Sequence, residues 1–215
     1  EIIIGTFRQR SDRIGPKRVI WRYDPILFSQ SMDVRYHLHG FEAIAKRLAS
    51  HTQTCVISFV DLYQKTRRNL RATTVREPSA DEITRLAAGL ASIASSYGIR
   101  IQSCAERIDL EPMGIRHGRC IDRMLIEELQ GARLNVARDR NQRPECGCVQ
   151  SVDIGVYDTC SHGCLYCYAN TDTKTVCRNR GLHDLSSPLL IGRMEEGDVV
   201  KERAIRSFKV SDALF

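Results

Sequence analysis

Three cysteines in residues 160–167 stand at a spacing that suits metal chemistry. The segment reads Cys-Ser-His-Gly-Cys-Leu-Tyr-Cys, so Cys160, Cys164 and Cys167 follow a C-x3-C-x2-C pattern. Three closely spaced thiolates can bind three irons of a cubane [4Fe–4S] cluster and leave the fourth iron without a protein ligand. A cofactor or substrate can bind at an iron left open in this way. The spacing therefore predicts a cluster-binding segment, and we call residues 160–167 the clamp.

Two other kinds of site compete with this interpretation of the clamp. Cys164 and Cys167 form half a zinc knuckle, and Cys160 or His162 would complete a tetrahedral zinc site. Zinc sites usually pair two separated knuckles, which the compact spacing fits poorly. A redox-active dithiol of the C-x2-C type is the second alternative, and it has no need for Cys160. We therefore favour iron–sulfur chemistry.

A second set of cysteines lies upstream of the clamp and comprises Cys104, Cys120, Cys146 and Cys148. Four thiolates satisfy either a closed [4Fe–4S] site or a structural zinc site, and a second cluster would suit electron transfer to the first. The alternative is that Cys104 and Cys120 are ordinary core residues and that the other two form a local redox pair. Cys55 falls within a predicted strand and is interpreted as a small buried hydrophobic residue.

Composition narrows the class of protein. The chain has 215 residues, of which 42% are hydrophobic and 27% charged, as is ordinary for a globular protein. The chain has nine cysteines, an odd number, and no secretory signal. This combination favours metal or redox chemistry in a reducing cytoplasm over a disulfide framework. The net charge of +6 is dispersed, which favours a solvated basic surface over a nucleic-acid groove. No apolar run is long enough to cross a bilayer, and the start at Glu1 leads us to expect further sequence upstream.

The pattern of apolar residues predicts the elements that must position these cysteines. Strands are predicted at residues 17–23, 54–60, 99–103 and 149–157. Helices are predicted at residues 1–13, 33–50, 79–97 and 122–130, the second with Asp33 as N-cap and the third with a capping box at Ser79. Such alternation is typical of parallel strands joined by crossover helices.

The predicted fold class is α/β, and four strand–helix units make about half of a β/α barrel. Residues 1–145 would form the barrel portion, and residues 146–215 would hold the last strand, the clamp and a C-terminal tail. An open doubly wound sheet is the alternative. In either architecture the functional groups gather at the carboxyl ends of the strands. The residues expected there, besides the clamp, are Arg22, Asp24, Ser58, Asp61, Cys104 and Glu106.

The clamp, with an aromatic residue before its third cysteine, resembles the signature of radical S-adenosylmethionine enzymes. The longer run of residues 152–170 is more specifically similar to the DUF1848 family, whose cysteine cluster lies near the C-terminus. Other segments that look like that family are residues 19–25, 55–59, 103–106, 117–122 and 145–148. The run of residues 160–169 is also similar to spore photoproduct lyase-like radical enzymes.

The resemblance implies a function and a set of ligands. Cys160, Cys164 and Cys167 would ligate a [4Fe–4S] cluster that cleaves S-adenosylmethionine to a 5′-deoxyadenosyl radical, which abstracts hydrogen from an unknown substrate. Tyr166 would pack near the adenine or the cluster. An electron donor such as ferredoxin or flavodoxin would reduce the cluster. Because the clamp comes late in the chain, the barrel would be circularly permuted. The alternatives are a non-catalytic iron–sulfur or zinc protein and a lyase-like nucleic-acid repair enzyme.

Overall fold

The computed structural model describes residues 1–210, which divide into two compact units. Unit 1 comprises Glu1–Val60, Thr73–Gly131 and Val136–Gln150. Unit 2 comprises Asp61–Ala72, Ala132–Asn135 and the described part of Ser151–Phe215. The second set of cysteines lies in unit 1 and the clamp lies in unit 2, so each site belongs to one unit.

Unit 1 is built on a four-stranded parallel sheet in which the strands follow one another in sequence order. The strands are β1 (Trp21–Ile26), β2 (Thr54–Phe59), β3 (Arg100–Ser103) and β4 (Arg116–His117). The predicted α/β class with parallel strands is confirmed. The sequence pattern predicted the first three strands, whereas the two-residue β4 falls where a loop was expected.

Three of the four α-helices of unit 1 begin at a side chain that accepts one of their free N–H groups. They are α1 (Ile2–Ile14), α2 (Val34–Leu48), α4 (Ala80–Ser96) and α5 (Arg123–Gln130). The Asp33 carboxylate accepts the N–H of Tyr36 at 2.8 Å at the start of α2. At the start of α4, Ser79 and Glu82 form both bonds of a capping box. The predicted caps of α2 and α4 are thus confirmed.

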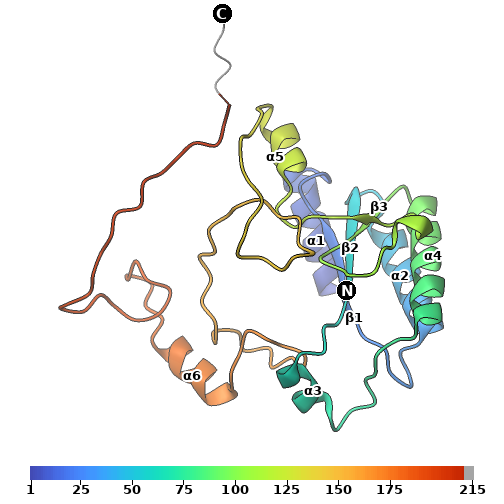
Figure 1. The fold of residues 1–215 in the computed structure, drawn as a ribbon, viewed down its shortest axis with the longest axis horizontal. Helices are drawn as coiled ribbons and strands as arrows, with labels where there is room; N and C mark the ends of the chain where they lie inside the picture. Colours follow the sequence, from blue (N-terminus) through green and yellow to red (C-terminus); the bar gives the residue numbers. More distant parts are fainter. Residues whose placement is uncertain (211–215) are drawn as a thin grey trace, which may run out of the picture. The chain divides into compact units, whose positions relative to one another are not determined.

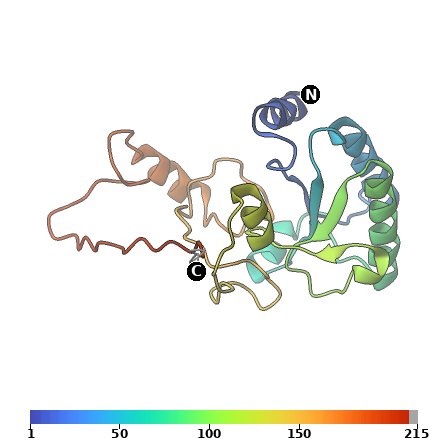
Figure 2. The ribbon, with the colours of Figure 1, turned by 90° about the horizontal axis from the view of Figure 1, so that it is seen from above.

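The main core lies between the sheet and two helices of unit 1. α2 and α4 run side by side along the sheet (Figures 1 and 2). Trp21 of β1 stacks on Phe41 of α2 with ring centroids 4.5 Å apart. The two helices approach closely where Leu38 packs over Gly89, since a Cβ at that glycine would lie 2.5 Å from a Leu38 methyl carbon. Dense packing of this kind holds the strands and fixes their carboxyl ends.

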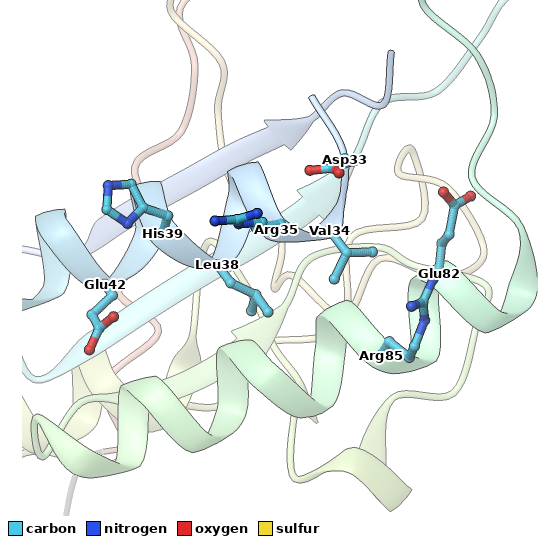
Figure 3. Close-up of a pocket in the computed structure, with 8 residues that line it drawn as sticks. All are labelled: Asp33, Val34, Arg35, Leu38, His39, Glu42, Glu82 and Arg85. Carbon is cyan, nitrogen blue, oxygen red and sulfur yellow. The ribbon is translucent and has the colours of Figure 1, made fainter. Parts of the chain in front are cut away.

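A groove between α2 and α4 is the polar hollow shown in Figure 3, with Val34 and Leu38 at its floor. Two of its three carboxylates stabilise the ends of the helices. Asp33 caps α2, and Glu82 caps α4 while it pairs with Arg76 at 2.6 Å. These two carboxylates are therefore committed to the ends of the helices.

Unit 2 has two helices, α3 (Gln64–Leu70) and α6 (Thr173–Gly181), within its described residues. The strand predicted at residues 149–157 is wrong, because residues 151–157 have no helix or strand. Ile154 is 83% exposed, and the Asp153 carboxylate accepts the N–H of Gly155 in a local turn. The alternating apolar residues thus have no neighbouring strand to pair with. After α6 the described chain continues as irregular structure with one isolated bridge, from Lys209 to Leu134 (Figure 1).

Within residues 1–210, no helix combines the length and the apolar content that crossing a membrane requires. This agrees with the absence of a long apolar run in the sequence.

Candidate functional site

Cys104 and Cys120 meet at the carboxyl edge of the sheet in unit 1. Cys104 directly follows β3 and Cys120 follows β4, and their Sγ atoms lie 3.0 Å apart. The N–H of Gly118 donates to the carbonyl of Ser103 at 2.7 Å and so joins the ends of the two strands. Parallel pairing of β3 with β4 therefore places these two thiols side by side.

Cys146 and Cys148 form a second pair beside the first. Both are buried, and they pack with Cys104 and Ile121 in a small cluster separate from the main core. The Sγ atom of Cys148 accepts two backbone hydrogen bonds, from the N–H of Cys120 at 3.2 Å and that of Ile121 at 3.3 Å. The structure thus brings together all four cysteines of the predicted second set, and we call them the four-cysteine site.

Side chains from outside the turn that carries Cys146 and Cys148 hydrogen-bond to its backbone carbonyls. The Arg138 guanidinium donates hydrogen bonds to three of its carbonyls, those of Arg143, Pro144 and Cys146. Nε2 of His117 donates to the carbonyl of Glu145 at 2.6 Å, because a carbonyl can only accept. The turn is therefore positioned by β4 and by the Arg138 side chain.

Arg22 connects the four-cysteine site to the other strand ends. Its guanidinium donates to Sγ of Cys120 at 3.1 Å and to Asp24 at 2.5 Å, and the Ser58 hydroxyl donates to Asp24 at 3.4 Å. Glu106 accepts the N–H of the last residue of β2 at 2.7 Å. The strand-end residues Arg22, Asp24 and Ser58 therefore form one network with Cys120. The positive charge of Arg22 favours the thiolate form of Cys104, the cysteine paired with Cys120.

The thiols of unit 1 differ in acidity because their surroundings differ. The pKa of Cys104 is lowered to about 6, first by the hydrogen bond from Cys120 and then by Arg22. The pKa of Cys120 is raised, because its thiol gives that hydrogen bond and because it is partly buried. Burial raises the pKa of Cys146 and of Cys55. Buried Cys55 in β2 therefore stays a neutral thiol, in line with its predicted role as a small hydrophobic residue.

The clamp lies in a loop of unit 2 whose two ends are tied together. The N–H of Asp158 donates to the carbonyl of Ala169 at 3.0 Å, and the Thr171 hydroxyl donates to the Asp158 carboxylate at 3.0 Å. Inside the loop, the N–H of Cys167 donates to the carbonyl of Cys164 at 3.0 Å and closes a tight turn. The clamp is therefore a closed loop with a hydrogen-bonded base.

Helices α6 and α3 anchor the clamp loop through side-chain amides and a guanidinium. From α6, Asn179 donates to the carbonyl of Asp158 at 3.1 Å, and Arg180 donates to the Ser161 hydroxyl at 2.7 Å. From α3, the Asn69 amide donates to the carbonyl of Leu165 at 3.2 Å. These bonds fix the backbone of the clamp on two sides.

The clamp thiols remain accessible. Cys160 and Cys164 are exposed and Cys167 is partly buried, and within the described residues none of their sulfur atoms makes a hydrogen bond. The Asn170 amide donates to the carbonyl of Cys160 at 2.6 Å, while its oxygen is buried and has no partner in residues 1–210. The loop thus presents three thiols and buries one unsatisfied acceptor.

A pocket of about 310 Å³ lies beside the clamp in unit 2. It is lined by Val156, Thr159, Asn179, Arg180, His183, Leu190 and Ile191. Thr159 directly precedes Cys160, and Arg180 also binds Ser161, so the pocket and the clamp share their walls. The pocket therefore offers space for a small molecule beside the clamp loop.

The side chains do not surround a single point as metal ligands do. Within residues 1–210, no group of three or more His, Cys, Asp or Glu side chains has that arrangement. In the four-cysteine site the sulfurs stand as two neighbouring pairs, and in the clamp they point outward along one loop. The structure therefore shows proximity of the predicted ligands and leaves the ligation itself a prediction.

Sequence reasoning missed α6 and the side chains that brace the two sites. Asp172 accepts the N–H of Thr175 at 2.9 Å, a cap that the sequence did display. Arg138, Asn170 and Arg180 lie in polar segments where no periodic pattern distinguishes them. Their partners are mostly backbone carbonyls, and side-chain-to-carbonyl contacts leave no complementary residue to find in the sequence.

The comparisons with known proteins give one match. The family model described as "Domain of unknown function (DUF1848)" matches residues 1–169, which include the clamp and the four-cysteine site. No curated protein and no solved structure shows a significant match to the chain.

Proposed function

Because the chain belongs to the DUF1848 family, whose description names no activity, we propose a function from its own residues. The protein is a radical S-adenosylmethionine-type enzyme that binds a [4Fe–4S] cluster through Cys160, Cys164 and Cys167. The observation that carries this proposal is the clamp loop itself, which combines three accessible thiols with a backbone held by hydrogen bonds from α3 and α6.

The residues at the clamp suit the proposed group. Soft thiolate ligands select iron–sulfur clusters, and three of them leave one iron for another ligand. The buried Asn170 oxygen has no partner in the described residues, so the loop holds one acceptor that the fold leaves unsatisfied. The pocket of about 310 Å³ beside the clamp gives room for a small ligand. Donor set, acceptor and space are thus found together in unit 2.

When bound and reduced, the cluster would supply the electron that cleaves S-adenosylmethionine at the open iron and so starts hydrogen abstraction from the substrate. The chain's own residues would hold the cluster and orient the cofactor. The Cys164–Cys167 turn sets the spacing of two thiols, and the Asn170 amide holds the carbonyl of Cys160. Tyr166, partly buried next to the third cysteine, would pack against the adenine or the cluster.

Arg180 would bind the carboxylate of the cofactor. Its guanidinium both lines the pocket and holds the hydroxyl of Ser161 within the clamp. Arginine is the side chain best suited to a carboxylate, because its planar donors match the two oxygens. Reduction would come from an electron donor such as ferredoxin or flavodoxin in a reducing cytoplasm.

The sheet of unit 1 would be part of a circularly permuted β/α barrel. What supports this is the strand order, in which each crossover adds the next strand on the same side. A doubly wound sheet instead reverses its order at a switch point, and the four strands contain no such reversal. Sequential parallel strands are what the wall of a barrel requires.

Anaerobic reconstitution with iron and sulfide tests the proposal. The reduced protein should convert S-adenosylmethionine to methionine and 5′-deoxyadenosine, measured by liquid chromatography and mass spectrometry. The variant with Cys160, Cys164 and Cys167 all changed to alanine should lose both iron and product. Arg180→Ala should keep its iron and bind the cofactor about 10- to 150-fold more weakly, since a charge-assisted hydrogen bond contributes about 1.5–3 kcal/mol. Arg178→Ala, on the same helix, is the matched control and should behave as the wild type.

One result would overturn the proposal. A protein that carries about four irons on the clamp and is fully reduced, yet forms no 5′-deoxyadenosine, binds a cluster for another purpose.

A further inference from the structure

We propose that Cys104, Cys120, Cys146 and Cys148 bind one zinc ion in a closed structural site of unit 1. The inference concerns residues outside the clamp and does not depend on the radical chemistry proposed for unit 2. It would give residues 104–131 and 136–150 the cross-link that their packing lacks.

The first argument is the poor core around the four-cysteine site. Between Cys104 and Gln150, the regular structure of unit 1 is a 3-10 turn (Glu111–Met113), β4 and α5. No residue of α5 is buried, and three of the five residues in the local cluster are cysteines. Leu110 and Ile115 reach the main core, but between residues 116 and 150 the buried hydrophobic residues are Cys146 and Cys148. Apolar burial therefore offsets little of the entropy lost on ordering residues 116–150. A structural metal stabilises segments of this kind directly.

The second argument is the set of donors aimed at sulfur. Cys148 accepts two backbone N–H groups, and Cys120 accepts a guanidinium N–H from Arg22. A neutral thiol is a weak acceptor, whereas a thiolate is a strong one. Three N–H donors on two sulfurs therefore indicate a site that holds negative charge. Four thiolates with one Zn²⁺ carry a net charge of −2, and such hydrogen bonds are the usual outer support of metal-bound sulfur.

The third argument distinguishes zinc from a second iron–sulfur cluster. Zn–S bonds of about 2.3 Å in a tetrahedron place the sulfurs about 3.8 Å apart. A cubane holds each thiolate on a different iron and so spreads the sulfurs further. The Cys104 and Cys120 sulfurs, hydrogen-bonded at 3.0 Å, must separate by about 0.8 Å to reach the zinc spacing and by more to reach the spacing on a cubane. The compactness of this pair therefore favours a single ion.

Hydrogen bonds hold the backbone on both sides of the four-cysteine site. The turn with Cys146 and Cys148 is fixed by Arg138 and His117, and the N–H of Cys104 donates to the carbonyl of Ile57 at 2.9 Å. Rotation of cysteine side chains between staggered positions moves their sulfurs while the backbone stays in place. Zinc binding would therefore bring the two pairs together by rotation of the cysteine side chains.

Metal analysis of the purified protein tests this inference. The wild type should contain about one zinc per chain. The clamp variant Cys160→Ala/Cys164→Ala/Cys167→Ala should keep that zinc. In Cys146→Ser/Cys148→Ser the zinc content per chain should fall at least fivefold. Cobalt provides a readout on the intact wild type, since Co²⁺ in place of zinc should give the intense visible bands of a tetrahedral tetrathiolate site. This measurement stands even if the double serine variant does not fold.

Three results would overturn the inference. The first is a wild type and a clamp variant that bind neither zinc nor cobalt after supplementation. The second is a clamp variant that retains iron and sulfide, which assigns a second cluster to the four-cysteine site. The third is zinc that stays bound in a folded Cys146→Ser/Cys148→Ser protein. Loss of iron from the clamp variant bears only on the proposed function, so the two proposals fail separately.

Discussion

Gly118→Ala should weaken unit 1 through a single backbone contact. A Cβ at this position would lie 2.8 Å from the carbonyl oxygen of Ser103 and 2.6 Å from Cδ of Gln102. The Gln102 side chain can rotate away, but the Ser103 carbonyl belongs to the end of β3 and accepts the N–H of Gly118 at 2.7 Å. To restore an ordinary contact of 3.4 Å, β3 and the residue after β4 must separate by 0.6 Å, from 2.8 to 3.4 Å.

The expected cost is about 1–3 kcal/mol, the range for adding a methyl group where the structure is tightly packed. Urea unfolding followed by far-UV circular dichroism measures it as a lower midpoint with an unchanged slope. Gly5→Ala is the matched control, because it adds the same methyl group to α1 with no atom within 4 Å. It should leave stability unchanged or raise it by up to about 1 kcal/mol. If Gly118→Ala unfolds at the same urea concentration as the wild type, the close approach described here is wrong.

Three further predictions concern a cap, a buried histidine and the clamp turn. Ser79→Ala removes one bond of the capping box with Glu82 and should cost about 1 kcal/mol in urea unfolding, while an unchanged midpoint would contradict the cap. His37 is buried and donates through Nε2 to the Leu27 carbonyl at 2.9 Å, and burial lowers its pKa below the ordinary 6.5. As the pH falls, His37 is protonated in the unfolded chain before it is protonated in the folded one. Neutral His37 therefore contributes fully to stability above pH 6.5, and this contribution is lost at lower pH. The free energy of unfolding should decline from pH 7 to 5, and His37→Gln should reduce that decline. Gly163 has φ 66 within the clamp, so Gly163→Ala should cost about 1–2 kcal/mol locally and lower the iron content after reconstitution, whereas Gly163→Asn, which tolerates this backbone, should retain more.

The sequence predicted well those elements whose signals are local. The caps at Asp33 and Ser79 are in place, and the three longer strands lie within a few residues of their predicted positions. The rule that parallel strands gather function at their carboxyl ends also led to Arg22 and Cys104. Both now belong to one network through Cys120. Periodicity and capping thus sufficed where one helix or strand determines the outcome.

Elements that depend on a distant partner escaped prediction. Val152, Ile154 and Val156 alternate as a strand would, but the sequence contains no sign that a pairing strand is missing. β4 spans only two residues and exists because β3 supplies its hydrogen bonds. α6 buries one residue, Val176, so it lacks the apolar stripe by which helices are usually found. In each case tertiary contacts, rather than local preference, decide the structure.

Electron paramagnetic resonance of the anaerobically reconstituted, reduced protein tests the central claim most directly. The account predicts the signal of a reduced [4Fe–4S] cluster that is absent from the Cys160→Ala/Cys164→Ala/Cys167→Ala variant. It further predicts that S-adenosylmethionine shifts this signal, because the fourth iron has no protein ligand. A protein that binds no iron through the clamp, or a cluster whose signal is unchanged by S-adenosylmethionine, would contradict the account.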